Sequence, residues 1–438
     1  MKRSTRLFLL LGLVLVFAVS WVVVLTAKSP AQKQAELIEQ AANYMSDDIY
    51  VLAAPLLEEA IGYNAPRTVE AENMLKRAYL EMIGQRGVRR EYIALLDKQM
   101  GRSDAKDDVF VEAAEFYLKD AKFEEAFAVI KEGIAKTQSG VLKTLYENNR
   151  YEYKMEFTTF DDVTTSVGAT IGVRRGDKWG IASSGGATIV PCEYDKVSTF
   201  SNGRAIVKKD GVIYAIDNNG NRLALHKGNA TDFGNLGNDR IPLLIEGKWY
   251  RGSGDLLVGT TAFDWIGTYR EGYAAAQQNG KWGVVDTSSN WLIPADYDGV
   301  IVDELGRSYA RGAAFVKQGN SAILFVDGVQ TGEVYEDARP FGNEGYAAVK
   351  RNGKWGFIDL AGEVKIDFQF DDALSFGQHL AAVKQGEFWG YASLSGEVVI
   401  EPVFLGAKSF ASGSAPVLID SGWRFITLVE FRTTGGGL

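Results

Sequence analysis

Cysteine and histidine are almost absent from this chain. Its 438 residues include one cysteine, Cys192, and two histidines, His226 and His379. A single cysteine excludes an intramolecular disulfide and a metal site built from several cysteines. The sequence also lacks the Gly-x-Ser-x-Gly, His-Glu-x-x-His, phosphate-loop and dinucleotide-binding motifs. We therefore expect no catalytic activity, no metal and no cofactor.

The chain also lacks an excess of basic residues. Its formal net charge is −9, whereas nucleic-acid-binding proteins gain much of their affinity from lysine and arginine contacts to phosphates. We therefore expect no nucleic-acid partner. Hydrophobic residues make up 46% of the chain and aromatic residues 12%, which predicts folded domains with apolar cores.

A long apolar run lies at the N-terminus. Lys2, Arg3 and Arg6 precede the uncharged residues 7–27, and a helix of that length, about 31 Å, would cross a bilayer. Because cleaved signal peptides have shorter apolar regions that end in small residues, we favour an uncleaved signal-anchor over cleavage. The basic residues predict that 1–6 are cytoplasmic, and that the protein is a single-pass cell-membrane protein with most of its chain extracytoplasmic.

Residues 28–150 have the spacing of amphipathic helices, with apolar side chains three and four positions apart. Helix-breaking segments divide this region into about three helical hairpins, and they fall at 46–48, 62–66, 84–87 and 101–104. Within 108–137, small residues such as Ala114 and Gly133 alternate with large ones such as Phe123. This stretch resembles a tetratricopeptide repeat, in which small residues let paired helices approach closely.

Residues 151–431 have the pattern of repeated β-strands. Segments related to NGKWGVVD (279–286) and NGKWGFID (352–359) recur about every 34 residues, with isoleucines Ile213 and Ile323 at the tryptophan position in two of them. The tryptophans predicted to be structural anchors of this column are Trp179, Trp249, Trp282, Trp355, Trp389 and Trp423. Because an alternating apolar run precedes and follows most of these segments, we predict about eight three-stranded units.

These columns resemble the WG-containing (KWG) repeat of bacterial proteins. The resemblance covers about 157–431 and implies a β-rich repeat domain of a bacterial envelope or multidomain protein, with no defined activity. We predict that the units close into a β-propeller-like ring, because closure removes exposed strand edges. Pairing of a segment near 157–173 with the last unit around 425–431 would close the ring. An open β-solenoid is the alternative, and 432–438 are predicted to be a flexible tail.

Few residues are candidates for binding. Paired carboxylates recur at equivalent repeat positions, as in Asp296 with Asp298, which favours turns and caps over calcium binding or glycoside hydrolysis because a catalytic pair is needed only once. Trp265 and Trp291 lie outside the anchor column. They are our candidates for stacking on a sugar ring, with additional core residues as the alternative.

The sequence thus predicts a non-catalytic scaffold of the bacterial envelope, anchored in the membrane. Its helical and β-repeat surfaces would bind protein partners. The alternative function is a membrane-tethered module that binds cell-wall glycan.

Overall fold

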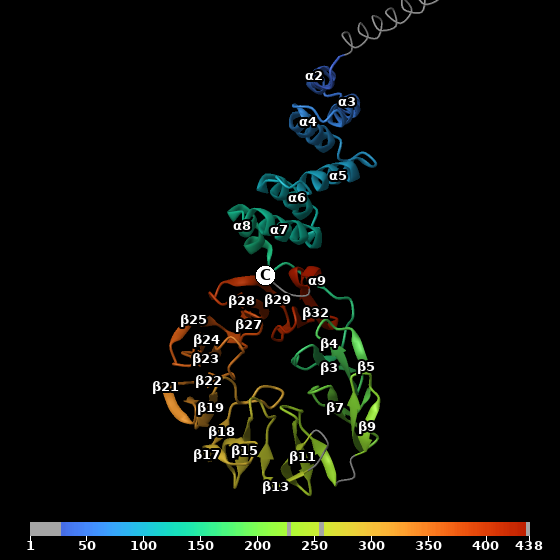
Figure 1. The fold of residues 1–438 in the computed structure, drawn as a ribbon. Helices are drawn as coiled ribbons and strands as arrows, with labels where there is room; N and C mark the ends of the chain where they lie inside the picture. Colours follow the sequence, from blue (N-terminus) through green and yellow to red (C-terminus); the bar gives the residue numbers. More distant parts are fainter. Residues whose placement is uncertain (1–27, 226–228, 254–257, 435–438) are drawn as a thin grey trace, which may run out of the picture. The chain divides into compact units, whose positions relative to one another are not determined.

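The computed structural model describes residues 28–225, 229–253 and 258–434 (Figure 1). The chain divides into two compact units between Tyr146 and Glu147.

The predicted transmembrane helix, 7–27, lies outside the described residues. A membrane-spanning helix needs about 20 mostly apolar residues. No helix in the part of the chain that the structure describes is long and apolar enough, and α2, with 17 residues, is amphipathic. We therefore withdraw the predicted single-pass location at the cell membrane, with most of the chain extracytoplasmic.

Helices occupy residues 30–149. In chain order they are α2 (Pro30–Ser46), α3 (Tyr50–Gly62), α4 (Thr68–Glu81), α5 (Val88–Met100), α6 (Asp107–Lys119), α7 (Phe123–Thr137) and α8 (Gly140–Asn149). The four predicted breaks fall at or between their ends. Ser29 and Gln32 form a capping box that fixes the start of α2, in which each side chain accepts the backbone N–H of the other residue.

A glycine allows α7 to pack closely in this helical unit. A Cβ atom added to Gly133 would lie 2.8 Å from the Phe110 side chain of α6 and 2.6 Å from Leu142 of α8. Close approach therefore requires the smallest residue here. The resemblance to tetratricopeptide repeats stays a prediction.

The second unit is an eight-bladed β-propeller of four-stranded antiparallel sheets (Figure 1). Blade 1 comprises β2 (Asp162–Val163), β3 (Thr170–Arg175), β4 (Lys178–Ser183) and β5 (Thr188–Tyr194); blade 2 comprises β6 (Lys196–Val197), β7 (Arg204–Lys209), β8 (Val212–Asp217) and β9 (Arg222–Leu225). Blade 3 comprises β10 (Ala230–Phe233), β11 (Arg240–Ile245), β12 (Lys248–Ser253) and β13 (Val258–Phe263); blade 4 comprises β14 (Trp265–Ile266), β15 (Tyr273–Gln278), β16 (Lys281–Asp286) and β17 (Trp291–Tyr297).

The later blades repeat this order. Blade 5 comprises β18 (Gly299–Val300), β19 (Ala313–Gln318), β20 (Ser321–Val326) and β21 (Val329–Tyr335); blade 6 comprises β22 (Asp337–Ala338), β23 (Ala347–Arg351), β24 (Lys354–Ile358) and β25 (Val364–Phe370). Blade 7 comprises β26 (Asp372–Ala373), β27 (Leu380–Gln385), β28 (Phe388–Ser393) and β29 (Val398–Phe404); blade 8 comprises β30 (Gly406–Ala407), β31 (Ser414–Ile419), β32 (Gly422–Leu428) and β1 (Tyr153–Met155), and α9 (Val429–Thr434) follows β32.

The prediction of three-stranded units is wrong, because each blade has four strands. The strand that the sequence did not reveal begins each blade and in seven blades is only two residues long, as in β6 and β14. Two residues cannot show the alternation by which a strand is recognised. These short strands lie toward the middle of the ring, whereas longer strands such as β9, β13 and β21 lie at its rim (Figure 1).

A strand from the start of the β unit closes the ring. β1 pairs with β32 in register Tyr153 with Leu428 and Met155 with Ile426, and Phe160 exchanges two backbone hydrogen bonds of 2.9 Å with Trp423. The open solenoid is therefore wrong. The closing strand lies just before the predicted segment, 157–173, whose Phe160 makes only an isolated bridge.

Candidate interaction site at the centre of the ring

The Trp-Gly dipeptide allows the outermost strand of a blade to pack closely against its neighbour. Trp282 lies opposite Tyr297 in β17, and the pairing shifts register directly after Trp282. A Cβ atom on Gly283 would lie 2.3 Å from the carbonyl oxygen of Ile293. Because no side chain fits at such a distance, glycine is needed where the outermost strand bulges inward.

Blade 3 is one of four blades without this glycine, and its outermost strand pairs differently. In blade 3, Tyr250 occupies the glycine position and pairs regularly with Ala262, and the irregularity follows Tyr250 instead. In blade 5, Ala322 pairs with Lys317 just as Trp282 pairs with Gln277. The tryptophan column therefore contains Ala322 rather than Ile323.

Repeated carboxylates join neighbouring blades. Asp298, between β17 and β18, accepts a 2.9 Å ion pair from Lys281 of blade 4 and a 2.9 Å hydrogen bond from the Gly319 N–H of blade 5. Equivalent lysine and backbone contacts occur at Asp195, Asp264 and Asp371. We call these four residues the junction carboxylates.

The junction contacts stabilise the charged form of each carboxylate. The hydrogen bond from Lys178 holds the pKa of Asp195 below its ordinary value, and Lys354 acts in the same way on Asp371. For Asp298 the largest cause of the lowered pKa is the Gly319 N–H, followed by Lys281. These carboxylates therefore have a structural task that is repeated at four blade junctions.

A second set of contacts links the turns that follow the short strands. A side chain of one turn accepts a backbone N–H from the turn of the next blade, as in Glu271 to Arg311 (2.6 Å), Glu344 to His379 (3.1 Å) and Gln378 to Gly413 (2.6 Å). His379 thus lies in a turn, at φ 64°. His226 lies outside the described residues.

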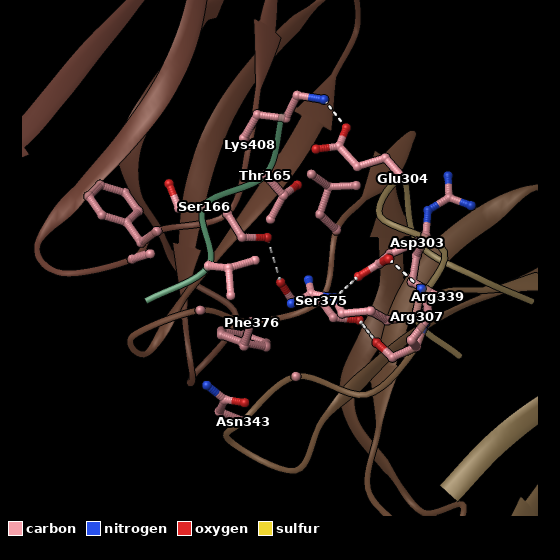
Figure 2. A pocket seen from close by; sticks show the side chains of 18 of the residues that line it. Thr165, Ser166, Asp303, Glu304, Arg307, Arg339, Asn343, Ser375, Phe376 and Lys408 are labelled. Carbon is pink, nitrogen blue, oxygen red and sulfur yellow. Dashed lines mark hydrogen bonds and ion pairs between the residues drawn. The ribbon is translucent and has the colours of Figure 1, made fainter. Parts of the chain in front are cut away.

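These turns surround a cavity of about 710 Å³ (Figure 2). Most of its wall comes from the turns after the short strands of blades 1, 5, 6, 7 and 8, and Arg270 of blade 4 and strand residues such as Trp389 complete it. Since those strands lie toward the middle of the ring, the cavity occupies the ring's centre.

Blade 5 sends a longer connection into this centre. The residues between β18 and β19, 301–312, form what we call the blade-5 loop, whereas 267–272 make the same connection in blade 4. Asp303 shapes the loop by accepting the N–H groups of Leu305 (3.0 Å) and Arg307 (2.9 Å). From its tip, Glu304 forms an ion pair with Lys408 of blade 8 (Figure 2).

Charged side chains of both signs line the cavity. Arg307 pairs with Asp303 at 2.7 Å and Arg339 with Asp372 at 3.3 Å. Arg270 donates to the carbonyl oxygen of Phe341 (3.2 Å) and to the side chain of Asn343 (2.8 Å). Burial is the largest cause that lowers the pKa of Arg270, and the nearby charge of Arg307 lowers it further.

The two tryptophans predicted to bind a sugar lie outside the cavity lining. Trp265, in β14, is half-buried with its ring centroid 5.2 Å from that of Trp282. Trp291, in β17, is half-buried and meets Phe263 edge to face at 6.2 Å. The sugar-binding role of both stays a prediction. Of the predicted anchors, Trp355 is 3% exposed and Trp389 contributes to the cavity wall.

The residues of the cavity could not be recognised in the sequence. Ser166, Arg270 and Lys408 lie far apart in the chain and meet only because the ring closes. One signal was present: the first repeat has Ser166 where six of the other seven have an aromatic residue, such as Phe200, Tyr269 or Phe410.

Six segments of the chain match the family described as WG containing repeat, at residues 179–212, 261–282, 282–320, 334–355, 355–387 and 389–423. The chain is a WG-containing repeat protein. The gap between the first two matches includes Ile213 and Tyr250, which replace the tryptophan and the glycine of the repeat.

No curated protein is significantly similar to this WG-repeat protein. Among solved structures, Kluyveromyces lactis Hsv2 matches with a TM-score of 0.34 and 8% identity over 62% of this chain and 97% of its own. The WD40 domain of SCAP from fission yeast matches with a TM-score of 0.37 and 7% identity, over 63% of this chain and 98% of its own. YCF48 bound to D1 peptide matches with a TM-score of 0.32 and 12% identity, over 64% of this chain and 96% of its own.

Proposed function

We propose that this WG-repeat protein is a non-catalytic scaffold that binds protein partners at the centre of its ring and on its helical unit. The observation that carries the proposal is that recurring polar residues and polar residues that occur once lie in different places. Those that recur, such as the junction carboxylates, hold blades together, whereas the features that occur once, the blade-5 loop and the cavity, meet at the centre. A rigid ring with one distinctive face is suited to binding.

The helical unit offers a second surface. A cavity of about 600 Å³ there is lined by apolar side chains, such as Leu80 and Val141, and by charged ones, such as Asp108 and Glu115. Leu80 is 42% exposed and Val141 58% exposed. Exposed apolar side chains gathered at a hollow are typical of a protein-binding surface.

Site-specific photo-crosslinking in the full-length protein tests the proposal. A photoreactive residue replaces Asn343, an exposed residue of the cavity wall, and a matched variant carries it at Val329, which is 66% exposed on the rim strand β21. In cells of the source organism, we expect discrete protein adducts from position 343 and none from position 329. Equal labelling from both positions, or none from 343, would contradict a central binding site.

The glycan-binding alternative remains a prediction for Trp265 and Trp291. Loss of binding to isolated peptidoglycan after Trp291→Ala, with an unchanged circular dichroism spectrum, would support it. Unchanged binding, or no binding by the native protein, would leave the protein-binding scaffold as the proposed function.

A further inference from the structure

Blade 1 lacks a large side chain at the centre of the ring. In seven blades an apolar residue occupies the turn that precedes the second strand, and six of the seven are at most 5% exposed: Leu236, Tyr269, Tyr309, Phe341, Phe376 and Phe410. Blade 1 has Ser166 at this position, directly before the bridge between Val167 and Thr170, just as Phe410 precedes the bridge between Ala411 and Ser414. The space that other blades fill themselves is therefore part of the cavity.

Ser166 itself points to an unfilled site. Its side chain lines the cavity, the residue is 7% exposed, and its hydroxyl has no hydrogen-bond partner among the described residues. Buried hydroxyl groups are normally hydrogen-bonded, and an unpaired one costs free energy. A ligand that fills this space could also satisfy the hydroxyl.

Lys408 lines the same cavity (Figure 2). Its side chain is 18% exposed, and its Nζ lies 5.4 Å from the ring centroid of Trp423. Its one ion-pair partner within the described ranges is Glu304, which is 35% exposed at the tip of the blade-5 loop. A largely buried ammonium needs an anion beside it, but this anion comes from the more exposed partner on a loop.

The rest of the cavity favours negative charge. Arg270 forms no ion pair in the part of the chain that the structure describes, and the two groups to which it donates hydrogen bonds, the Phe341 carbonyl and the Asn343 side chain, are neutral. Of the three carboxylates in the lining, Asp303 and Glu304 belong to the blade-5 loop, so the loop supplies most of the negative charge of the site. An incoming carboxylate could therefore substitute for the loop's own.

We propose that the cavity binds a peptide segment in which a carboxylate adjoins a bulky apolar side chain. The carboxylate displaces Glu304 from Lys408, and the apolar side chain fills the space beside Ser166. The blade-5 loop then acts as an internal competitor of the ligand. This inference rests on the proposed scaffold function and specifies the chemistry of its partner.

Fluorescence anisotropy with the full-length protein tests the ligand chemistry. The probe is a labelled hexapeptide, Gly-Ser-Glu-Phe-Ser-Gly, and two matched peptides carry lysine for its glutamate or alanine for its phenylalanine. We expect the first to bind at least about tenfold more tightly than either control, since each loses one of the two contacts. Equal affinities overturn the proposal. The proposal is also overturned if the peptide does not bind but inorganic phosphate does, and if that phosphate binding depends on Lys408.

Two substitutions at one ion pair should act in opposite directions. Lys408→Gln removes the anchor and should weaken binding at least about tenfold. Glu304→Gln removes the competitor and should strengthen it about threefold or more. Breaking the pair affects folding in the same sense in both variants, so a structural role cannot produce opposite signs. Weakening by both, or no change in either, overturns the proposal.

Ser166→Phe places in blade 1 the residue type that four other blades carry, and it should abolish binding without lowering the melting temperature. Lys178→Gln, at a junction ion pair outside the cavity lining, is the matched control and should leave binding unchanged. Retained binding by Ser166→Phe overturns the proposal. Crosslinked protein adducts from position 343 without binding of the acidic peptide would overturn this inference alone, and absence of adducts would count against the scaffold function.

Discussion

Charged residues are used differently at the blade junctions and at the centre of the ring. At four junctions a lysine of the Lys-Trp motif meets an aspartate that lies between its own blade and the next, for example Lys178 with Asp195 at 2.5 Å. At the centre each charged contact occurs once, and Glu304 with Lys408 joins residues 104 positions apart. Recurrence therefore marks what the ring needs for folding, and departures from it mark where a partner can be recognised.

The largest effect should come from breaking the repeat at its glycine. Gly283→Ala forces a Cβ atom to within 2.3 Å of the Ile293 carbonyl oxygen, and we expect the free energy of unfolding to fall by about 3 kcal/mol or more. Gly299→Ala is the control, because its Cβ would meet nothing closer than 3.4 Å. Urea unfolding followed by tryptophan fluorescence measures both. Equal stability of the two variants would refute the packing role of the Trp-Gly glycine.

A smaller loss should follow from weakening the closing strand. Tyr153 packs partly buried against the core shared by blades 7 and 8, with its ring centroid 6.1 Å from that of Phe404, so Tyr153→Ala should destabilise the ring by about 2 kcal/mol. Phe157→Ala, at a residue 90% exposed, should have no effect. Limited proteolysis of the full-length chain should cut the Tyr153 variant faster, and identical digestion rates would argue against closure by β1.

The smallest effect concerns the junction carboxylates and pH. The pKa values of Asp195, Asp264, Asp298 and Asp371 are lowered in the folded protein. Stability from such groups is fully present above the unfolded pKa of about 3.9 and is lost as pH falls through the lower folded value. The melting temperature of the native ring should therefore decrease as the pH is lowered below about 4.

The matching variant replaces all four junction carboxylates with asparagine. Its melting temperature at pH 7 should be slightly lower than that of the native ring, and its decline below about pH 4 should be shallower. Asp296→Asn, beside one junction, serves as the control. A decline as steep as that of the native protein would show that other groups govern the acid sensitivity.

The sequence revealed the number of repeats because tryptophan and glycine recur at regular intervals. It did not reveal the strand Lys196–Val197 and its equivalents, which are too short for an alternating pattern. It placed Ile323 in the tryptophan column because an apolar residue was expected there, whereas pairing puts Ala322 in that position. The cavity could not be predicted, because Ser166, Glu304 and Lys408 are brought together only by the closed ring.

The pairing of β1 with β32 also determines when the ring can close during synthesis of the chain. The ribosome makes β1 first among the strands and its partner last, with all the other blades between them. Until residues 422–428 have emerged, β1 has no strand to complete and the outer edge of β32 does not exist, so the ring cannot be finished during synthesis. A chain that is cut short before blade 8 would expose unpaired strand edges, which template aggregation. A chain is therefore either a closed propeller or an incomplete form with exposed strand edges. Cellular quality control can distinguish the two by those edges.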